Sequence, residues 1–476
     1  MHNISFIKRS LFFLFAFIAL QNVIYAQYFD TDNKYAMSLS EVLDKIEQRY
    51  HIVIKRKPKM EEGKIVDYAL WRFKSNVDST LASVLNNLDI NAIKIDSAHY
   101  ELKEYQYYRW NVQDGWNELD RISSQYHNKQ QWELRKDSLR EELYQALELS
   151  PLPAKPNMQP VVTKERIYNG YSVQNIAIEI LPGLYINGSL YKPLRIHGKI
   201  PIMLSPDGHW DQQRYRPDCQ IRCATLARMG CMAYSYDLFA WGESLLQFKT
   251  EDHRRSLSQV VQTLGAIRIL DYVCSLKETD TSRIGISGGS GGGSHTVLMA
   301  ALDKRIKLSA PVVSVSSYFY GGCPCESGMP IHFCAGGTDN VELAAMAAPN
   351  PQLLISDGKD WTQHMPEHDF PYLKKMYGYY NAESNVENVH LPIEGHDYGI
   401  SKRAALYHFV AKYFGLDIRK IEKDGTIDES KATIEKEAEM YVFGDKGQYL
   451  PKDAIKGFDN LEKVFNKAIG KNYNEQ

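Results

Sequence analysis

A glycine-rich turn with a serine at its centre constrains the fold of this chain more than any other segment. Gly288-Gly289-Ser290-Gly291-Gly292 matches the pattern G-x-S-x-G. Residues 283–286 before it, which include Ile284 and Ile286, predict a strand, and the residues after it predict a helix. A sharp strand-to-helix turn strains the backbone of its central residue, so small neighbours are needed for the two elements to approach each other. A phosphate-binding loop fits less well, because its Lys-Ser/Thr pair is absent, and a dinucleotide fold would place such a turn after the first strand.

Strands and helices alternate over residues 160–416, which indicates a mostly parallel sheet covered by helices on both faces. The strands are expected at 173–180, 185–191, 200–204, 231–236, 283–286, 308–315, 352–355 and 386–393, and the main helices at 219–228, 257–276 and 404–414. Together with the serine turn, this alternation predicts an α/β fold of the α/β-hydrolase type.

A serine hydroxyl is a weak nucleophile, so a base must accept its proton and an acid must orient that base. In α/β-hydrolases the chain order is Ser, acid, His. His396 follows the last expected strand and precedes the last helix, which makes it the candidate base for Ser290. Asp360, just after the strand at 352–355, is the candidate acid, with Asp357 and Glu326 as alternatives.

Two backbone amides should face the substrate oxygen on which negative charge develops. One is the amide of Gly291, directly after the serine, and the other is the amide of His209, in the turn after the strand at 200–204. Trp210 and Glu326 are candidates for the substrate pocket, although a packed loop aromatic is an equal interpretation of Trp210.

These motifs together resemble acetyl xylan esterases and cephalosporin-deacetylase-like α/β-hydrolases. The resemblance covers residues 160–416 and rests on Asp207-Gly208-His209, residues 236–244, the serine turn, Asp360 and Gly395-His396-Asp397. It implies deacylation of carbohydrate esters such as acetylated xylan, through an acyl-enzyme on Ser290 and without a metal. Well-known members carry Gln after the serine and Glu after the histidine, where this chain has Gly291 and Asp397. Glucuronoyl esterases carry Arg beside the nucleophile, and that Arg is absent.

Residues 1–26 have the organisation of a signal peptide. Lys8 and Arg9 precede an apolar run at 11–20, and Ala26 lies at a plausible cleavage point, so the mature chain is expected to begin near Gln27. No later stretch reaches the roughly 18 apolar residues that a membrane span requires. We therefore expect a periplasmic or secreted protein with no membrane span after cleavage; an uncleaved N-terminal anchor is the alternative.

Three further segments flank the hydrolase region. Residues 34–103 read as a small α+β unit that begins with a capping box at Ser38–Glu41 and resembles the short N-terminal (STN) domain of secretins and TonB-dependent receptors. The resemblance implies a protein partner. Residues 104–159 predict a helical connector that ends in a Pro-rich linker, and residues 417–476 a charged extension that wraps the surface.

Charge and cysteine content limit the kinds of ligand that the chain is expected to bind. The formal net charge of −2 provides no basic surface for a nucleic acid. Seven cysteines cannot all pair within one molecule. Cys323, Cys325 and Cys334 lie near one another in the chain, so a disulfide in this segment is one interpretation and a zinc site is the alternative. No second Cys pair or His pair has metal-ligand spacing, so we expect no metal and no cofactor.

Two other functions fit parts of the sequence. A serine peptidase related to prolyl oligopeptidases would have the same serine turn, but residues 27–150 are too few for the propeller domain of that family. A catalytically inactive interaction protein with an STN-like domain would not need Ser290, Asp360 and His396 together. An acylated carbohydrate or another small ester is the expected substrate.

Overall fold

The computed structural model describes residues 36–85, 88, 90–104, 110–157, 159–326 and 331–471. The chain divides into two compact units, residues 1–106 and 107–476. The expected signal peptide at 1–26 lies outside the described residues. Within the described part of the chain, no helix combines the length and apolar character needed to cross a membrane.

The first unit has a core of its own. Helix α2 begins at a capping box, in which the Ser38 side chain accepts a hydrogen bond from the Glu41 amide, and buries Leu39, Val42 and Ile46 on one face. Strand β5 pairs parallel with β2 and antiparallel with β4, and β1 pairs with β3. In chain order the elements are β1 (Met37–Ser38), α2 (Leu39–Tyr50), β2 (Val53–Lys55), α3 (Pro58–Glu61), β3 (Ile65–Val66), η1 (Ala69–Arg72), α4 (Val77–Leu85), β4 (Ile90–Lys94) and β5 (His99–Glu104).

A ten-stranded sheet organises the second unit, in the order β15-β14-β13-β12-β10-β11-β9-β8-β6 with β7 beside β8. From β15 to β11 the strands are parallel, and β9, β8, β7 and β6 join antiparallel. The strands are β6 (Val161–Val162), β7 (Arg166–Ile167), β8 (Tyr171–Leu181), β9 (Leu184–Pro193), β10 (Ile200–Pro206), β11 (Met232–Tyr236), β12 (Thr279–Gly289), β13 (Leu308–Val312), β14 (Gln352–Asp357) and β15 (Val386–Leu391).

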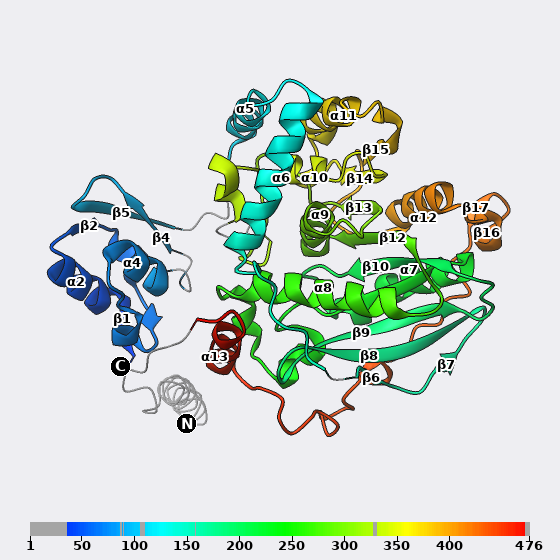
Figure 1. The fold of residues 1–476 in the computed structure, drawn as a ribbon, viewed down its shortest axis with the longest axis horizontal. Coiled ribbons are helices and arrows are strands. Elements are labelled where there is room, and N and C mark those ends of the chain that lie inside the picture. The colour runs from blue at the N-terminus through cyan, green and yellow to red at the C-terminus, as the bar shows by residue number, and fades with distance from the viewer. Residues whose placement is uncertain are drawn as a thin grey trace, which may run out of the picture. The chain divides into compact units, whose positions relative to one another are not determined.

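Helices cover both faces of this sheet (Figure 1). Side chains alternate along a strand, so Ile202 and Leu204 of β10 join one buried cluster with α8 and α9, and Met203 joins another with α7 and α12. The arrangement confirms the predicted α/β-hydrolase fold. The helices are α7 (Pro217–Met229), α8 (Ser258–Ser275), α9 (Gly291–Leu302), α10 (Asn340–Ala345), α11 (Phe370–Gly378) and α12 (Ile400–Phe414).

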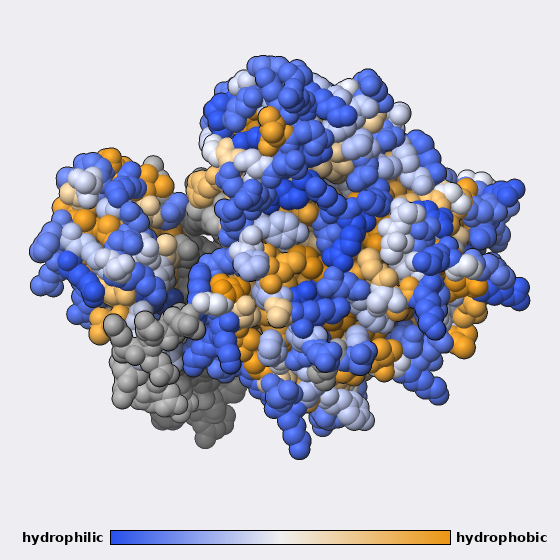
Figure 2. Space-filling view, in the orientation of Figure 1, coloured by the Kyte–Doolittle hydropathy of each residue, from blue (hydrophilic) through white to orange (hydrophobic). Residues whose placement is uncertain are grey.

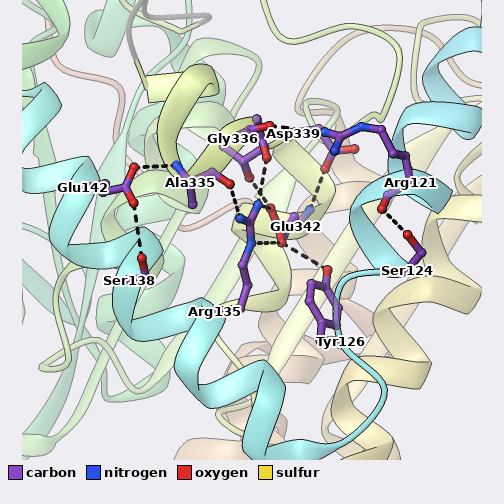
Figure 3. A network of polar contacts seen from close by, with 12 residues as sticks. Arg121, Ser124, Tyr126, Arg135, Ser138, Glu142, Ala335, Gly336, Asp339 and Glu342 are labelled. Carbon is purple, nitrogen blue, oxygen red and sulfur yellow. Dashed lines mark hydrogen bonds and ion pairs between the residues drawn. The ribbon is translucent and has the colours of Figure 1, made fainter.

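The helices of the expected connector, α5 (Val112–Ser123) and α6 (Lys129–Ala146), belong to the second unit. Figure 3 shows α6 beside the segment 331–345, with Arg135 pointing at Glu342. Arg135 donates to both carboxylate oxygens of Glu342, each at 2.9 Å, and the carboxylate is fully buried. Glu142 accepts a hydrogen bond from the Ala335 amide at 2.6 Å. A buried ion pair and a hydrogen bond to the backbone therefore fix α6 to the hydrolase core.

Residues 417–471 contribute to the core as well as to the surface. Helix α13 (Phe458–Ala468) was not expected from the sequence, and it buries Phe458, Leu461 and Phe465. Val442 and Phe443 pack with Tyr185 of β9 in a separate buried cluster.

The face of the protein shown in Figure 2 is mostly hydrophilic, with apolar residues scattered over it.

Candidate active site

Ser290 occupies the turn between β12 and α9, as the motif predicts. Its backbone has φ 53° and ψ −123°, a region that residues with side chains rarely adopt, and its amide donates to the Val312 carbonyl at 3.0 Å. The turn packs tightly on β10, because a Cβ on Gly292 would lie 2.6 Å from the Pro206 carbonyl oxygen. Glycine at this position lets the turn hold Ser290 at the carboxyl end of the sheet.

The three side chains that the sequence predicts for catalysis meet at this turn. His396 Nε2 lies 2.9 Å from Ser290 Oγ, and His396 Nδ1 lies 2.7 Å from Asp360 Oδ2. The Asp360 side chain is 3% exposed and the His396 ring 25% exposed. Both ring nitrogens are therefore within hydrogen-bonding distance of the partners needed to move a proton from serine to histidine.

Asp360 is held as a carboxylate. Burial raises its pKa, but hydrogen bonds from His396 and Thr362 outweigh burial and leave the pKa below its usual range. The Thr362 amide and hydroxyl both donate to Asp360 Oδ1 at 2.6 Å. The remaining oxygen, Oδ2, is the one that faces His396.

The two alternative acids have other partners. Asp357 pairs with Lys402 at 3.2 Å and accepts the Lys359 amide at 3.1 Å, so it shapes the turn after β14. Burial and the neighbouring Asp360 charge raise the pKa of Asp357. Glu326 accepts the Gly322 amide at 2.7 Å, and burial raises its pKa too. The oxygen bonded to His396 Nδ1 is that of Asp360.

A buried lysine that sequence reasoning missed holds the histidine loop. Lys402 Nζ donates to the Gly395 carbonyl at 2.5 Å and to Asp397 Oδ1 at 2.8 Å, in addition to its ion pair with Asp357. It thus ties the residues on both sides of His396 to the end of β14. No motif marks a lysine at this point of α12, so the sequence held no signal for it.

Two tryptophans enclose the histidine ring. The Trp361 ring centroid lies 4.5 Å from that of His396, and the Trp210 centroid lies 5.6 Å from it. Trp210 was predicted as a pocket residue and lies beside the triad, with the Arg216 guanidinium over its ring. Trp361 was not predicted, although it directly follows Asp360, because its position alone does not separate an aromatic beside the site from one packed elsewhere.

The predicted oxyanion donors lie next to each other. Gly291 is the first residue of α9, so its amide has no partner within the helix. A Cβ on Gly291 would lie 2.4 Å from His209 Cε1, which places the loop after β10 directly over the turn. The His209 side chain, however, points to His253 and Cys325, with Nε2 at 2.8 and 3.0 Å.

Comparisons with known proteins show which enzymes the chain is similar to. A family model described as acetyl xylan esterase (AXE1) matches residues 252–320. The solved structure of Methylesterase BT1017 is 47% identical, with 93% of this chain and 99% of that chain covered and a TM-score of 0.74. A putative acetyl xylan esterase from Bacteroides fragilis is 17% identical over 56% of this chain and 77% of that chain, with a TM-score of 0.45. None of the curated proteins compared with the chain matches it.

The fold and these comparisons define a carboxylic-ester hydrolase of the serine type. At 47% identity over nearly its whole length, the chain belongs to the family of the methylesterase just described.

Proposed function

We propose that the protein is an exported serine esterase that cleaves esters of carbohydrates through an acyl-enzyme on Ser290. The observation that carries the proposal is the continuous chain Ser290 Oγ, His396, Asp360, with hydrogen-bond distances of 2.9 and 2.7 Å. His396 takes the serine proton as the hydroxyl attacks the ester carbonyl, and Asp360 stabilises the imidazolium that forms.

The amides of Gly291 and His209 are assigned to stabilise the negative charge that develops on the carbonyl oxygen. These two residues lie on adjoining segments. His396 then gives its proton to the departing alcohol. A water molecule deprotonated by the same ring hydrolyses the acyl-enzyme and regenerates Ser290. Each donor of this kind contributes roughly 3 kcal/mol to transition-state stabilisation.

A methyl ester is the first candidate for the bond cleaved, because the relative that shares 47% identity is named a methylesterase. In a carbohydrate, such an ester requires a sugar carboxylate, so the sugar would remain on Ser290 and methanol would leave. An acetyl ester is the second candidate, favoured by the acetyl xylan esterase match at residues 252–320. There the acetyl group would remain on the serine and the sugar would leave.

Product analysis separates these candidates. Wild type and Ser290→Ala are compared on a methyl-esterified oligouronide, on acetylated xylan and on a prolyl peptide amide, with methanol, acetate and amine as readouts. We expect ester turnover by the wild type and a loss of about 10⁴-fold or more in the variant. Turnover of the peptide alone would support the peptidase alternative, and equal turnover by both proteins would reject Ser290 as nucleophile.

Export and a protein-binding role of the first unit complete the proposal. The signal-peptide pattern of residues 1–26 supports export, and an N-terminus near Gln27 in the mature protein would test it. The STN-like resemblance of residues 34–103 supports an interaction module. If it binds a partner protein, deleting residues 36–104 should abolish co-purification of that partner and leave turnover of a small soluble ester within about 2-fold.

A further inference from the structure

Four metal-binding side chains from three separate segments converge beside the serine turn. They are His209 on the loop after β10, His253 in the short helix η5 (Thr250–Arg254), and Cys323 and Cys325 on the loop after β13. Their ligand atoms all lie within 4.8 Å of one another. His253, Cys323 and Cys325 are each at most 5% exposed. None of these residues is required by the catalytic steps above, apart from the backbone amide of His209.

The distances are close to those of a tetrahedral site. Zinc bonds of about 2.0–2.1 Å to nitrogen and 2.3 Å to sulfur imply ligand atoms roughly 3.3–3.8 Å apart. His209 Nε2 lies 3.0 Å from Cys325 Sγ and 3.3 Å from Cys323 Sγ, and His253 Nε2 lies 3.5 Å from Cys323 Sγ. The two Nε2 atoms are 2.8 Å apart. Small shifts of these four atoms would bring them to the separations of a tetrahedral site.

The outer contacts of the two histidines orient the same ring nitrogen inward. His253 Nδ1 lies 2.5 Å from the Phe239 carbonyl, which it can only donate to, and His209 Nδ1 faces Glu326 Oε2 at 3.8 Å. A metal-bound histidine characteristically directs its other nitrogen to a carbonyl or carboxylate. In a neutral His253 whose Nδ1 is the donor, Nε2 is the acceptor, and this is the form that binds a metal.

We propose that His209, His253, Cys323 and Cys325 bind one zinc ion. Two nitrogen and two sulfur ligands in a tetrahedral arrangement select zinc over the harder divalent cations. Two thiolates balance the charge of Zn²⁺, so the complete site is neutral and suits a buried location. All four positions are filled by protein, which identifies a structural rather than a catalytic ion. The sequence predicted no metal because that prediction used only the spacing of ligands along the chain. The four ligands proposed here are up to 116 residues apart, so their spacing gives no such signal.

The location of the site gives the ion a positioning role. His209 contributes its ring to the cluster, while its amide is the proposed oxyanion donor; this part of the inference rests on the proposed function. A zinc ion would fasten the loop after β10 to η5 and to the loop after β13. It would thereby hold the His209 amide against the serine turn, where Gly291 leaves space for the ring.

Metal content tests the site directly. The full-length protein, produced with zinc in the medium and freed of loosely bound ions, is measured by inductively coupled plasma mass spectrometry. We expect about one zinc per chain in the wild type and in Cys274→Ser, a control that removes a thiol outside the cluster. Cys323→Ser and His253→Gln should each lower the content at least 5-fold. Ser290→Ala should keep its zinc and lose turnover, which separates failure of the metal site from failure of the proposed function.

Cobalt provides a second readout that does not depend on the folding of a variant. After removal of zinc from the wild type with a chelator, added Co²⁺ should give the near-ultraviolet thiolate charge-transfer bands and the intense visible bands of a tetrahedral site. A zinc-supplied wild type with less than 0.2 equivalents of zinc, and no cobalt bands, would overturn the proposal, as would a different metal at stoichiometric occupancy. Full zinc content in both Cys323→Ser and His253→Gln would also overturn it.

Discussion

The backbone of Ser290 has a φ of 53°, where a residue with a Cβ is strained by about 1–3 kcal/mol. The hydrogen bond of its amide to Val312 and the close packing of Gly292 on β10 hold this conformation. Such a position admits few sequences, since both the serine and its small neighbours are needed. For this reason the five-residue motif alone was enough to predict Ser290 as the central residue of the candidate site.

Asp360→Asn should lower kcat by about 10⁴-fold with little change in fold stability. The amide that replaces the carboxylate cannot stabilise the imidazolium, and it favours the wrong tautomer of His396. The measurement is steady-state turnover of a small ester. Asp357→Asn, at the other carboxylate of the same turn, should lose at most about 10-fold; a larger loss there than at Asp360 would reassign the acid.

Residues beyond the triad were predictable only where the chain placed them next to a motif. The assignment of Gly291 and His209 as oxyanion donors stays a prediction, made from their positions after the serine and after β10. Trp361 adjoins Asp360 and was still missed, because nothing in the sequence separates a pocket aromatic from a packed one. The cluster of His253 with Cys323 and Cys325 could not be found from spacing, since only the folded sheet brings η5 and the loop after β13 together.

At the scale of the element, α12 supports the site through Lys402. This lysine is fully buried and contacts carbonyl and carboxylate oxygens on both sides of His396. The helix therefore positions the histidine loop and also packs against the sheet.

Lys402→Met should reduce kcat about 10- to 100-fold and destabilise the fold by roughly 3–5 kcal/mol, because Asp357 would be left as an unpaired buried charge. Lys412→Met, on the same helix, removes a surface pair with Glu387 and should cost less than about 1 kcal/mol. Chemical denaturation and turnover of a small ester measure the two effects. Equal losses in the two variants would contradict a special role of Lys402.

Glu243 in η4 (Gly242–Leu246) joins the C-terminal segment to the sheet, because its carboxylate accepts the amides of Val442 and Phe443 at 2.8 Å. Burial raises the pKa of Glu243 to about 7 despite the nearby Arg214. The folded protein therefore holds this proton more tightly than the unfolded chain. The contribution of Glu243 to stability is greatest below its ordinary pKa of about 4.3 and declines as pH rises toward 7.

The free energy of unfolding of wild type minus that of Glu243→Gln should accordingly fall between about pH 4.5 and pH 7, by an amount on the order of 2 kcal/mol. Denaturant unfolding at several pH values provides the measurement. Glu437→Gln, at an exposed carboxylate in the same region, should change the free energy of unfolding by less than about 0.5 kcal/mol. A rising difference for Glu243→Gln would show that the carboxylate is stabilising when charged.

Helices and strands could be predicted where apolar residues recur at regular spacing. The strands at 173–180 and 200–204 and the helix at 257–276 all form, as β8, β10 and α8, with ends that differ by a few residues. Helix α13 was missed because its three buried residues stand in a charged, Lys-rich stretch. Its burial depends on the main apolar cluster of the second unit, which forms only when the rest of the unit has folded.

At the scale of the whole molecule, the connector helices extend the hydrolase unit. The ion pair of Arg135 and Glu342 is buried and bidentate (Figure 3). The sequence predicted helices at 104–159 but could not show what they contact, since the partner residues lie some 200 positions later. Polar contacts between residues so far apart in the chain produce no periodic pattern in a single sequence.

Arg135→Met should lower the free energy of unfolding by about 3–5 kcal/mol, because Glu342 would stay buried without its partner. Replacing both residues, as Arg135→Met with Glu342→Gln, should recover part of that loss. Asp137→Asn, which removes a surface pair with Arg140 on the same helix, should change stability by less than about 0.5 kcal/mol. A double variant as unstable as the sum of both single variants would argue against direct coupling.

The missing side chain at Gly291 links two features that seem independent along the chain. The His209 ring fills the space that a Cβ at residue 291 would enter, so a bulky residue after the nucleophile and this histidine exclude each other. Any side chain larger than hydrogen at residue 291 would therefore push the His209 ring away from its contacts with His253 and Cys325.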